Sequence, residues 1–269
     1  MTDLSPTFPD LEPNIEIDPS AGDLDALWDR FEVFEAIHHS QRICNPMTEA
    51  ELDEVMTALA PEPGQRWLDL GCGSGELLIR AREGGVSAAT GWDLSPWMLN
   101  TASREGSARL GAGTSPRWIL GNGASSPTAA EHDVAVCVGA EWIWHGMRGT
   151  IAALRDRVTA GGQVAFGGPR LHFDADPTET SRTFGTLDTV ADVEDRLVEV
   201  GFSVRNRIDP GEAGWLAYLE RGRRDVMAWA QRHPGPRADR WLADMRDWVE
   251  AYERDRTVVG WSIWIADTA

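Results

Sequence analysis

The sequence predicts an α/β fold built on a mostly parallel sheet, and three observations lead to this prediction. Short apolar runs alternate with amphipathic stretches along the middle of the chain, which is the pattern of strands joined by helical crossovers. A glycine-rich turn, Gly71–Gly75, directly follows the first of these runs. The last apolar run comes after a long helical stretch. We therefore expect a seven-stranded sheet with helices before it and a helical insertion before its last strand.

Each expected strand is a short apolar run bounded by glycine, proline or polar residues. The runs are Arg66–Leu70, Ala88–Asp93, Arg117–Leu120, Val134–Val138, Gln163–Phe166, Phe202–Ile208 and Trp261–Ala266. Each expected helix has apolar residues at helical spacing, and the second starts with the capping-box sequence Thr48–Glu51. The helices are Leu24–His39, Thr48–Leu59, Glu76–Glu83, Pro96–Arg109, Thr150–Val158, Val190–Val200, Trp215–Gln231 and Arg237–Arg256.

The chain divides into a short arm and one domain. Residues 1–22 are acidic and proline-rich and are expected to form a disordered or loosely docked arm. Residues 23–269 form the domain, with N-terminal helices over 23–60 and a helical lid over 211–257. The arm lacks the features of a signal peptide, and no apolar run approaches the roughly 20 residues that span a bilayer. We therefore expect a cytoplasmic protein with no membrane partner.

The composition restricts the chemistry. The chain has 25 basic and 43 acidic residues and a net charge of −18, and every basic residue is Arg. A field this negative repels phosphate backbones, which argues against a nucleic-acid partner and suits a neutral or cationic small molecule. The absence of Lys excludes a Schiff-base mechanism. The three cysteines are widely spaced and predict neither disulfides nor a metal site.

The strongest motif is the strand–loop–helix segment Trp67–Leu78. Its glycines permit positive φ and a close approach to a ligand, and the free N–H groups at a helix start suit an anion or carboxylate. Dinucleotides and S-adenosylmethionine (SAM) both use this device. A dinucleotide fingerprint that starts at Gly71 needs a third glycine where the chain has Glu76, whose carboxylate would face the pyrophosphate. The spacing therefore favours SAM, and the predicted contacts in the loop are Asp69, Gly71, Cys72, Gly73 and Gly75.

Two further elements complete the predicted cofactor site. Asp93 ends the second strand, 22 residues after Gly71, where a carboxylate suits a ribose diol. Leu94 and Met98 follow it and can flank the adenine ring. After the third strand, Asn122–Gly123 offers a side-chain amide to the adenine edge, although Asn-Gly is also a common turn.

These motifs resemble those of the class I SAM-dependent methyltransferase family. The similarity covers about 46–166. Its motifs there include the segment Asp133–Ala140, in which Val138 is expected beside the cofactor. It looks closest to an uncharacterised bacterial branch of small-molecule methyltransferases. Similar segments are Ile43–Pro46, Gly139–Ile143 and the final Gly260–Trp261. The resemblance implies a Rossmann-like sheet with an antiparallel last strand and SAM as methyl donor, but no particular substrate.

The chain departs from this branch at two places. The branch tends to have G-E-P after the fifth strand, whereas this chain has Gly167–Pro169 with no acid. Conversely, Glu141, Trp144 and His145 follow the fourth strand, where the branch usually has small or neutral residues. The resemblance therefore assigns no role to these three residues.

Methyl transfer from a sulfonium is an in-line displacement, so positioning supplies much of the catalysis and a base is needed only if the acceptor loses a proton. The reactive crevice lies outside the carboxyl ends of the strands, where Glu141 and His145 are expected. His145 can take a proton and Glu141 can act as a base or anchor a cation, so both are catalytic candidates. The alternatives are an ordinary loop histidine and a helix N-terminal acid.

Other candidates lie on the flanking helices. Arg42 can pair with the SAM carboxylate, and His38 lies on the same helical segment as a candidate substrate contact; both can equally be surface residues. Five of the 13 tryptophans lie in the segments expected around the mouth, whereas Trp229, Trp241 and Trp248 on the inserted helices are expected to pack. Of the five, Trp142, Trp144 and Trp215 are the substrate-binding candidates, with Trp261 and Trp264 nearby. An aromatic wall can bind a flat or cationic acceptor, whereas ordinary core packing is the alternative.

The sequence thus predicts transfer of a methyl group from SAM to a small molecule, at oxygen or nitrogen rather than carbon, with specialised metabolism as one setting. A SAM-binding regulatory protein without turnover is the alternative, and a nicotinamide dehydrogenase is a third. A nucleic-acid amino-methyltransferase is disfavoured, because no N/D-P-P-Y/F motif follows the fourth strand. The oligomeric state cannot be read from the sequence.

Overall fold

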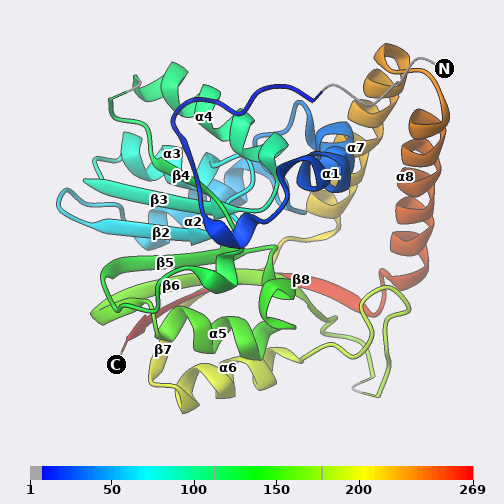
Figure 1. Cartoon of the computed structure of the whole chain (residues 1–269). Coiled ribbons are helices and arrows are strands. Elements are labelled where there is room, and N and C mark those ends of the chain that lie inside the picture. The colour runs from blue at the N-terminus through cyan, green and yellow to red at the C-terminus, as the bar shows by residue number, and fades with distance from the viewer. Residues whose placement is uncertain (1–7, 112, 177, 269) are drawn as a thin grey trace.

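The computed structural model describes residues 8–111, 113–176 and 178–268, and its centre is an eight-stranded sheet in the order β1-β4-β3-β2-β5-β6-β8-β7 (Figure 1). The strands are β1 (Ile15–Ile17), β2 (Arg66–Leu70), β3 (Ala88–Asp93), β4 (Arg117–Leu120), β5 (His132–Val138), β6 (Val158–Leu171), β7 (Phe202–Ile208) and β8 (Val259–Thr268). Neighbours from β1 to β6 pair in parallel, and β8 lies antiparallel between β6 and β7. The seven predicted strands and the antiparallel last strand are confirmed.

Helices cover both faces of the sheet: α2, α3 and α4 lie on one face and α5 and α6 on the other (Figure 1). The helices are α1 (Leu24–His38), α2 (Glu49–Leu59), α3 (Glu76–Glu83), α4 (Pro96–Leu110), α5 (Met147–Arg155), α6 (Val190–Glu199), α7 (Glu212–Arg232) and α8 (Pro236–Asp255). Short 3₁₀ turns, η1 (Pro19–Ala21), η2 (Gly123–Ser125) and η3 (Glu141–Trp144), lie between them. The capping box at Thr48 is present.

The bounds of most elements lie within three residues of the prediction, and the largest differences concern β6, which is longer at both ends, and α5, which is shifted toward the N-terminus. The helix expected over Thr150–Val158 runs from Met147 to Arg155, because Gly146 with its φ of 116° starts it early. At its end, Arg157 is buried and donates to the Ser126 carbonyl and hydroxyl oxygens, and Val158 already pairs with His132. Val158, the residue expected to end the helix, therefore begins a β6 that is longer than the predicted strand.

The expectation of a disordered or loosely docked arm is wrong for residues 8–22; residues 1–7 lie outside the described part. Ile15–Ile17 forms β1, which pairs with the otherwise unpaired edge of β4 and gives the sheet its eighth strand. Asn100 on α4 holds the preceding segment by accepting from Glu12 N at 2.8 Å and donating to the Asp10 carbonyl at 3.0 Å. The free backbone groups of a sheet edge, which composition does not reveal, explain this docking.

The inserted helices α7 and α8 pack on each other and on α1, beside the sheet (Figure 1). A separate apolar core joins these three helices and includes Ile37, Val226, Trp229, Trp241 and Met245. The packing role expected for Trp229 and Trp241 is confirmed.

Two charged residues of α7 fix the linker 39–48 that joins α1 to α2. Asp225, which is buried, accepts from the Ser40 amide at 3.0 Å and from its hydroxyl at 2.6 Å. Arg221 points at the carbonyls of Ile43, Asn45 and Met47 at 3.3–3.5 Å. The helical insertion therefore holds in place a linker that lies next to the glycine loop.

Candidate functional site

A cavity of about 750 Å³ opens at the carboxyl ends of β2, β3, β4 and β5. The loops after these strands form its floor, and α1, the linker 39–48, α7 and α8 form the opposite wall. This is where an open α/β sheet binds its ligands. Most of the predicted site residues line it: Asp69, Gly71, Cys72, Gly73, Asp93, Leu94, Met98, Asn122, Gly123, Val138, Arg42, Glu141, Trp142, Trp215 and His38.

The three glycines of the loop after β2 have positive φ and different neighbours. The amide of Gly71 donates to the Trp92 carbonyl at 2.8 Å, and that of Gly73 donates to Asp93 Oδ2 at 2.9 Å. A Cβ on Gly73 would meet only Met98 Cε at 3.6 Å, so the space above it is open to a ligand. A Cβ on Gly75 would lie 2.4 Å from the buried Trp118 ring. Gly75 does not line the cavity, and its predicted role as a cofactor contact is corrected to one of packing.

Two acids stand side by side at the end of β2 and β3. Asp93 Oδ1 accepts from the Ser95 amide at 2.8 Å, so its two oxygens join the glycine loop to the start of α4. Burial raises the pKa of Asp93, while hydrogen bonds from Ser95 and Gly73 oppose the shift. Burial, and then the charge of Asp93, raise the pKa of Asp69 to about 8. The pair is therefore suited to a cation that restores the charge of Asp69.

The residues that are predicted to contact adenine lie together at the cavity. Leu94, Met98, Asn122 and Gly123 line the cavity together with Trp92. Asn122 Oδ1 caps η2 by accepting from the Ala124 amide at 3.0 Å. Its amide nitrogen is therefore the group that remains for a ligand.

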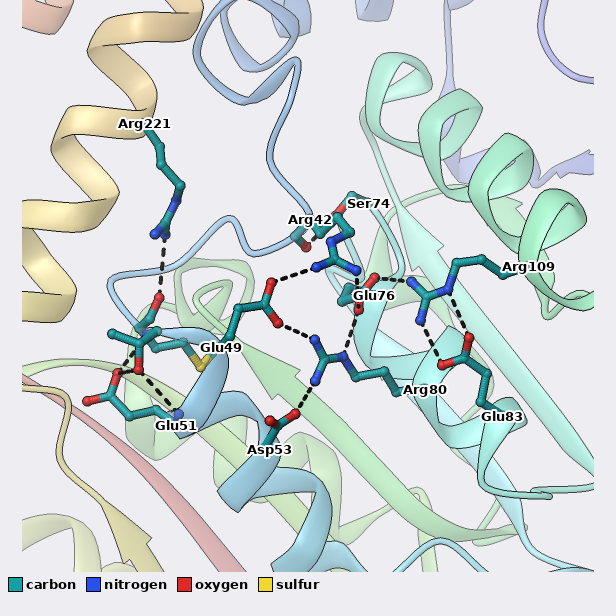
Figure 2. A network of polar contacts seen from close by, with 12 residues as sticks. Arg42, Glu49, Glu51, Asp53, Ser74, Glu76, Arg80, Glu83, Arg109 and Arg221 are labelled. Carbon is teal, nitrogen blue, oxygen red and sulfur yellow. Dashed lines mark hydrogen bonds and ion pairs between the residues drawn. The ribbon is translucent and has the colours of Figure 1, made fainter.

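Arg42 lines the cavity, but its guanidinium belongs to a network of charges (Figure 2). It donates to Glu49 at 2.8 Å and lies 3.9 Å from Glu76. The buried Glu76 also accepts from Arg80 at 2.7 Å and from Arg109 at 2.5 Å, so its carboxylate is compensated on the side away from the cavity. Binding of a ligand carboxylate by Arg42 stays a prediction.

Of the two catalytic candidates, the structure brings only Glu141 to the cavity. After β5 the chain forms η3, and His145 at its end has a left-handed φ of 60°; its side chain is exposed and does not line the cavity. His145 therefore loses its candidate role. Glu141 is half-buried, and burial raises its pKa.

The Glu141 carboxylate lies over Gly168 of β6. A Cβ on Gly168 would meet Glu141 Oε2 at 2.7 Å. The acid that is missing from Gly167–Pro169 is thus replaced in space by one that comes from the loop after β5. The Glu141 backbone amide offsets part of the rise in the pKa of this acid, and no other described residue donates a hydrogen bond to the carboxylate or forms an ion pair with it.

The tryptophans divide into two groups. Trp142 and Trp215 line the cavity as predicted, as does Trp261, whose ring meets that of Trp215 edge-on at 5.9 Å. Trp144 packs into the core beneath α5, with the Arg157 guanidinium 5.8 Å from its ring, and is corrected to a packing residue. Trp264 stacks on Phe166 in the same core.

Sequence reasoning missed several lining residues, among them Phe34 and Tyr218. The packing role expected for Trp248 is wrong, because its side chain is exposed and lines the cavity. Tyr218 follows Trp215 by three residues on α7, so helical spacing from a predicted contact is the signal that could have found it. In the described part of the chain, no helix is both long enough and apolar enough to cross a membrane.

Comparisons with known proteins agree with this geometry. Residues 68–162 match the family model described as a methyltransferase domain. The uncharacterised protein YjhP of Escherichia coli is 29% identical over 229 residues, which is 83% of this chain and 84% of YjhP. Its crystal structure has a TM-score of 0.77 over 88% of this chain and all of that one.

Two solved structures of bacterial SAM-dependent methyltransferases in complex with S-adenosylhomocysteine (SAH) are also similar. That from Geobacter sulfurreducens is 26% identical with a TM-score of 0.79. That from Thiobacillus denitrificans is 27% identical with a TM-score of 0.77. Both alignments cover 88% of this chain and 98% of the other.

Proposed function

We propose that this chain, a SAM-dependent methyltransferase by its domain and its fold, methylates an oxygen or nitrogen of a small, flat acceptor that is neutral or cationic. The observation that carries the proposal is one cavity with two unlike halves. One half has the glycine loop and paired acids, and the other has an aromatic wall with an acid, Glu141, that forms no ion pair with a described residue.

The cofactor half fits SAM. The open space over Gly73 leaves room for the ligand, and the raised pKa of Asp69 reflects a buried acid that a cation would stabilise. Bound SAM supplies an electrophilic methyl group on a sulfonium. In our proposal Asp93 accepts the ribose hydroxyls, and Leu94 and Met98 flank the adenine. The Asn122 amide reaches its edge, while the amides of Cys72 and Gly73 form the floor.

The charge of the cavity favours a neutral or cationic acceptor over an anionic one. Among the described residues, six carboxylates line it (Asp69, Glu76, Asp93, Glu141, Asp244 and Asp247), against the single guanidinium of Arg42. Arg42 is already paired with Glu49, and the charge of Glu76 is compensated. An anionic acceptor would find repulsion and no free cation, whereas a cationic amine could pair with Glu141.

The walls favour a flat acceptor, and the helical insertion closes over it. Trp142, Trp215, Trp248 and Trp261 line this half, and their faces suit stacking and cation–π contact. Trp248 comes from α8 and Trp215 from α7, so we propose that residues 211–257 form the lid that selects the acceptor. Exclusion of water and alignment with the methyl group are then what the chain contributes to the displacement.

The pH dependence of SAM binding tests the cofactor half. Below the raised pKa of Asp69 its carboxyl is protonated, and above it the carboxylate attracts the sulfonium. The ratio of the SAH to the SAM dissociation constant should therefore rise with pH up to about 8 and then level off. SAH has the same amine and carboxylate but no sulfonium charge. Calorimetry from pH 6 to 9 measures the ratio.

Asp69→Asn is the matched variant for this titration. It removes the titrating charge and keeps the shape, so its ratio should be flat with pH. It should also stabilise the unliganded protein at high pH, because ionising a buried acid costs folding free energy there. A wild-type ratio that does not change with pH would contradict the assignment of Asp69.

A charge series on one ring system tests the acceptor half. Tryptamine, indole-3-ethanol and indole-3-acetate are a cation, a neutral molecule and an anion of one shape. With SAH bound, tryptamine should bind at least about tenfold more tightly than indole-3-acetate, a difference of about 1.4 kcal/mol. Release of SAH from SAM in the presence of tryptamine or indole-3-ethanol would establish turnover. Preference for the anion, or SAM binding with no release for a broad set of amines and alcohols, would count against the proposal.

Two variants identify Glu141 as the source of the preference. Glu141→Gln should reduce the ratio of the two affinities toward one. Gly168→Ala keeps the acid but places a Cβ 2.7 Å from Oε2, so the carboxylate must move, and the ratio should fall there too. Both neighbours of the added Cβ, Glu141 and Met147, are ends of flexible side chains, so the fold should tolerate it.

A further inference from the structure

A buried histidine–tyrosine pair stands in the acceptor half of the cavity, where α1 meets α7. His38 is the last residue of α1 and Tyr218 lies on α7, 180 residues later. His38 Nε2 and Tyr218 Oη are 3.2 Å apart, and their rings stack at 5.8 Å. Both side chains are more than nine-tenths buried and both line the cavity. The pair is therefore part of the surface that an acceptor meets.

The surroundings of His38 decide which atom donates in this pair. Burial lowers the pKa of His38 to about 4; Asp225 opposes the shift and Arg221 adds to it, so the ring is neutral at pH 7. A neutral imidazole has one N–H and one lone pair. The Phe34 backbone, one helical turn earlier, offsets part of the lowered pKa, as a carbonyl acceptor near the ring does, and Nδ1 has no other partner among the described residues. We therefore assign the proton to Nδ1. With the proton on Nδ1, Nε2 accepts from the Tyr218 hydroxyl.

The Tyr218 oxygen is then left as a buried acceptor. Its proton is committed to His38, and this is its only hydrogen bond to a described residue. Burial is the main reason why the pKa of Tyr218 is raised, so the phenol stays protonated. A buried oxygen with unused lone pairs is stabilised by a ligand that donates to it, and a ligand that cannot donate leaves it unsatisfied.

The pair also lies close to the cofactor loops. Cys44 Sγ is 3.8 Å from the hydroxyl oxygen of Ser74 in the glycine loop. Cys44 is also close enough to Tyr218 to contribute, after burial, to the raised pKa of the phenol. Trp215, one turn before Tyr218 on α7, meets Trp261, which adjoins Gly139 at the end of β5. Tyr218 therefore faces the same space as the residues around the predicted methyl position.

We propose that Tyr218 determines specificity by accepting a hydrogen bond from the O–H or N–H group that is to be methylated, and that His38 is the positioning residue that keeps the Tyr218 proton turned away from it. The proposal rests on the proposed function and narrows its acceptor class to flat molecules that carry such a donor. It also distinguishes acceptor from product, because a methylated oxygen or ring nitrogen can no longer donate. The hydrogen bond thus holds the acceptor, and its loss on methylation favours release of the product.

Matched probes that differ by this one donor test the proposal. The pairs are phenol with anisole, indole with 1-methylindole, and 7-hydroxycoumarin with 7-methoxycoumarin, each titrated into the protein saturated with SAH. The wild type should bind the donor-bearing member of a pair more tightly. Tyr218→Phe keeps the ring and removes the oxygen, so it should weaken that member by about fivefold to tenfold, as loss of one hydrogen bond predicts, and leave the other unchanged.

Variants of the histidine separate its role from a structural one. His38→Leu frees the Tyr218 proton, so the hydroxyl can donate and the methylated members should bind as well as, or better than, their partners. His38→Gln restores an acceptor for that proton and should restore the wild-type preference. His39→Gln changes an exposed histidine that pairs with Glu35, and should have no effect.

Three results would overturn the proposal. The first is Tyr218→Phe binding both members of every pair as the wild type does. The second is an equal loss for both members, which would indicate a packing role only. The third is no binding of any probe by a wild type that binds SAH. Failure of the wild type to bind SAH itself would overturn the proposed function, and this inference with it.

Discussion

Replacing Asp93 with Ala should weaken SAM binding by about tenfold to a hundredfold, since the variant loses charge-assisted hydrogen bonding of about 1.5–3 kcal/mol in total. The side chain acts twice. Its Oδ2 holds the Gly73 amide at 2.9 Å, which shapes the loop, and the remaining lone pairs of both oxygens face the cavity, where we place the ribose. The Asp93 carboxylate is half-buried and burial raises its pKa, so hydrogen bonds from the ribose hydroxyls would stabilise its charged form.

Calorimetric titration with SAM and SAH measures this loss. Because the ribose is common to both ligands, Asp93→Ala should weaken them equally, in contrast to Asp69→Asn, which should act mainly on SAM. Asp244→Ala is the matched control, since Asp244 is another acid that lines the cavity but comes from α8. Unchanged affinity in Asp93→Ala would exclude the ribose assignment.

Gly75→Ala should destabilise the protein by about 2–4 kcal/mol, because the added Cβ must adopt a left-handed conformation and also overlaps a rigid neighbour. The φ of Gly75 is 75°, and its Cβ would lie 2.4 Å and 2.8 Å from two ring carbons of Trp118. Trp118 is fully buried in the core and cannot swing away as a flexible side chain would. Denaturant unfolding followed by tryptophan fluorescence and far-UV circular dichroism would measure the loss.

Gly73→Ala is the comparison that separates packing from binding. An alanine at position 73 must adopt the left-handed φ of 53°, which costs about 1–2 kcal/mol of stability. It adds no steric clash, because the atom nearest to its Cβ is Met98 Cε at 3.6 Å. Its Cβ would, however, enter the space that we assign to the cofactor. We therefore expect Gly75→Ala to lose more stability and Gly73→Ala to lose more SAM affinity relative to its stability. Equal losses of stability in the two variants would contradict this division.

Local signals were sufficient for the cofactor half of the site. Each cofactor segment is a strand, a turn and a helix start that are contiguous in the chain, so apolar runs and turn residues locate it. The bounds of β2, α3, β3 and β4 agree with the predictions, and Asp93 and Asn122 lie at the cavity as expected. The carboxyl ends of parallel strands meet at one edge of a sheet, which brings these segments together without further information.

Local sequence signals could not predict which side chains form the acceptor half of the site. Glu141 and His145 are four residues apart in one loop, and only the docking of η3 decides that the first faces the cavity and the second faces solvent. Trp144 and Trp142 are separated in the same manner. The arm is another example, because a free strand edge elsewhere in the chain orders residues 15–17.

The sequence by itself determined seven of the eight strands, the helical insertion and the position of the cofactor loops, since these depend on periodicity and turn chemistry within single segments. Only the tertiary structure decided the acceptor side. There Glu141 takes the space over Gly168, and His38 meets Tyr218 across 180 residues of chain. The physical reason is that the direction of a side chain on a loop or helix is set by packing against distant elements, and a single sequence does not record which elements those are.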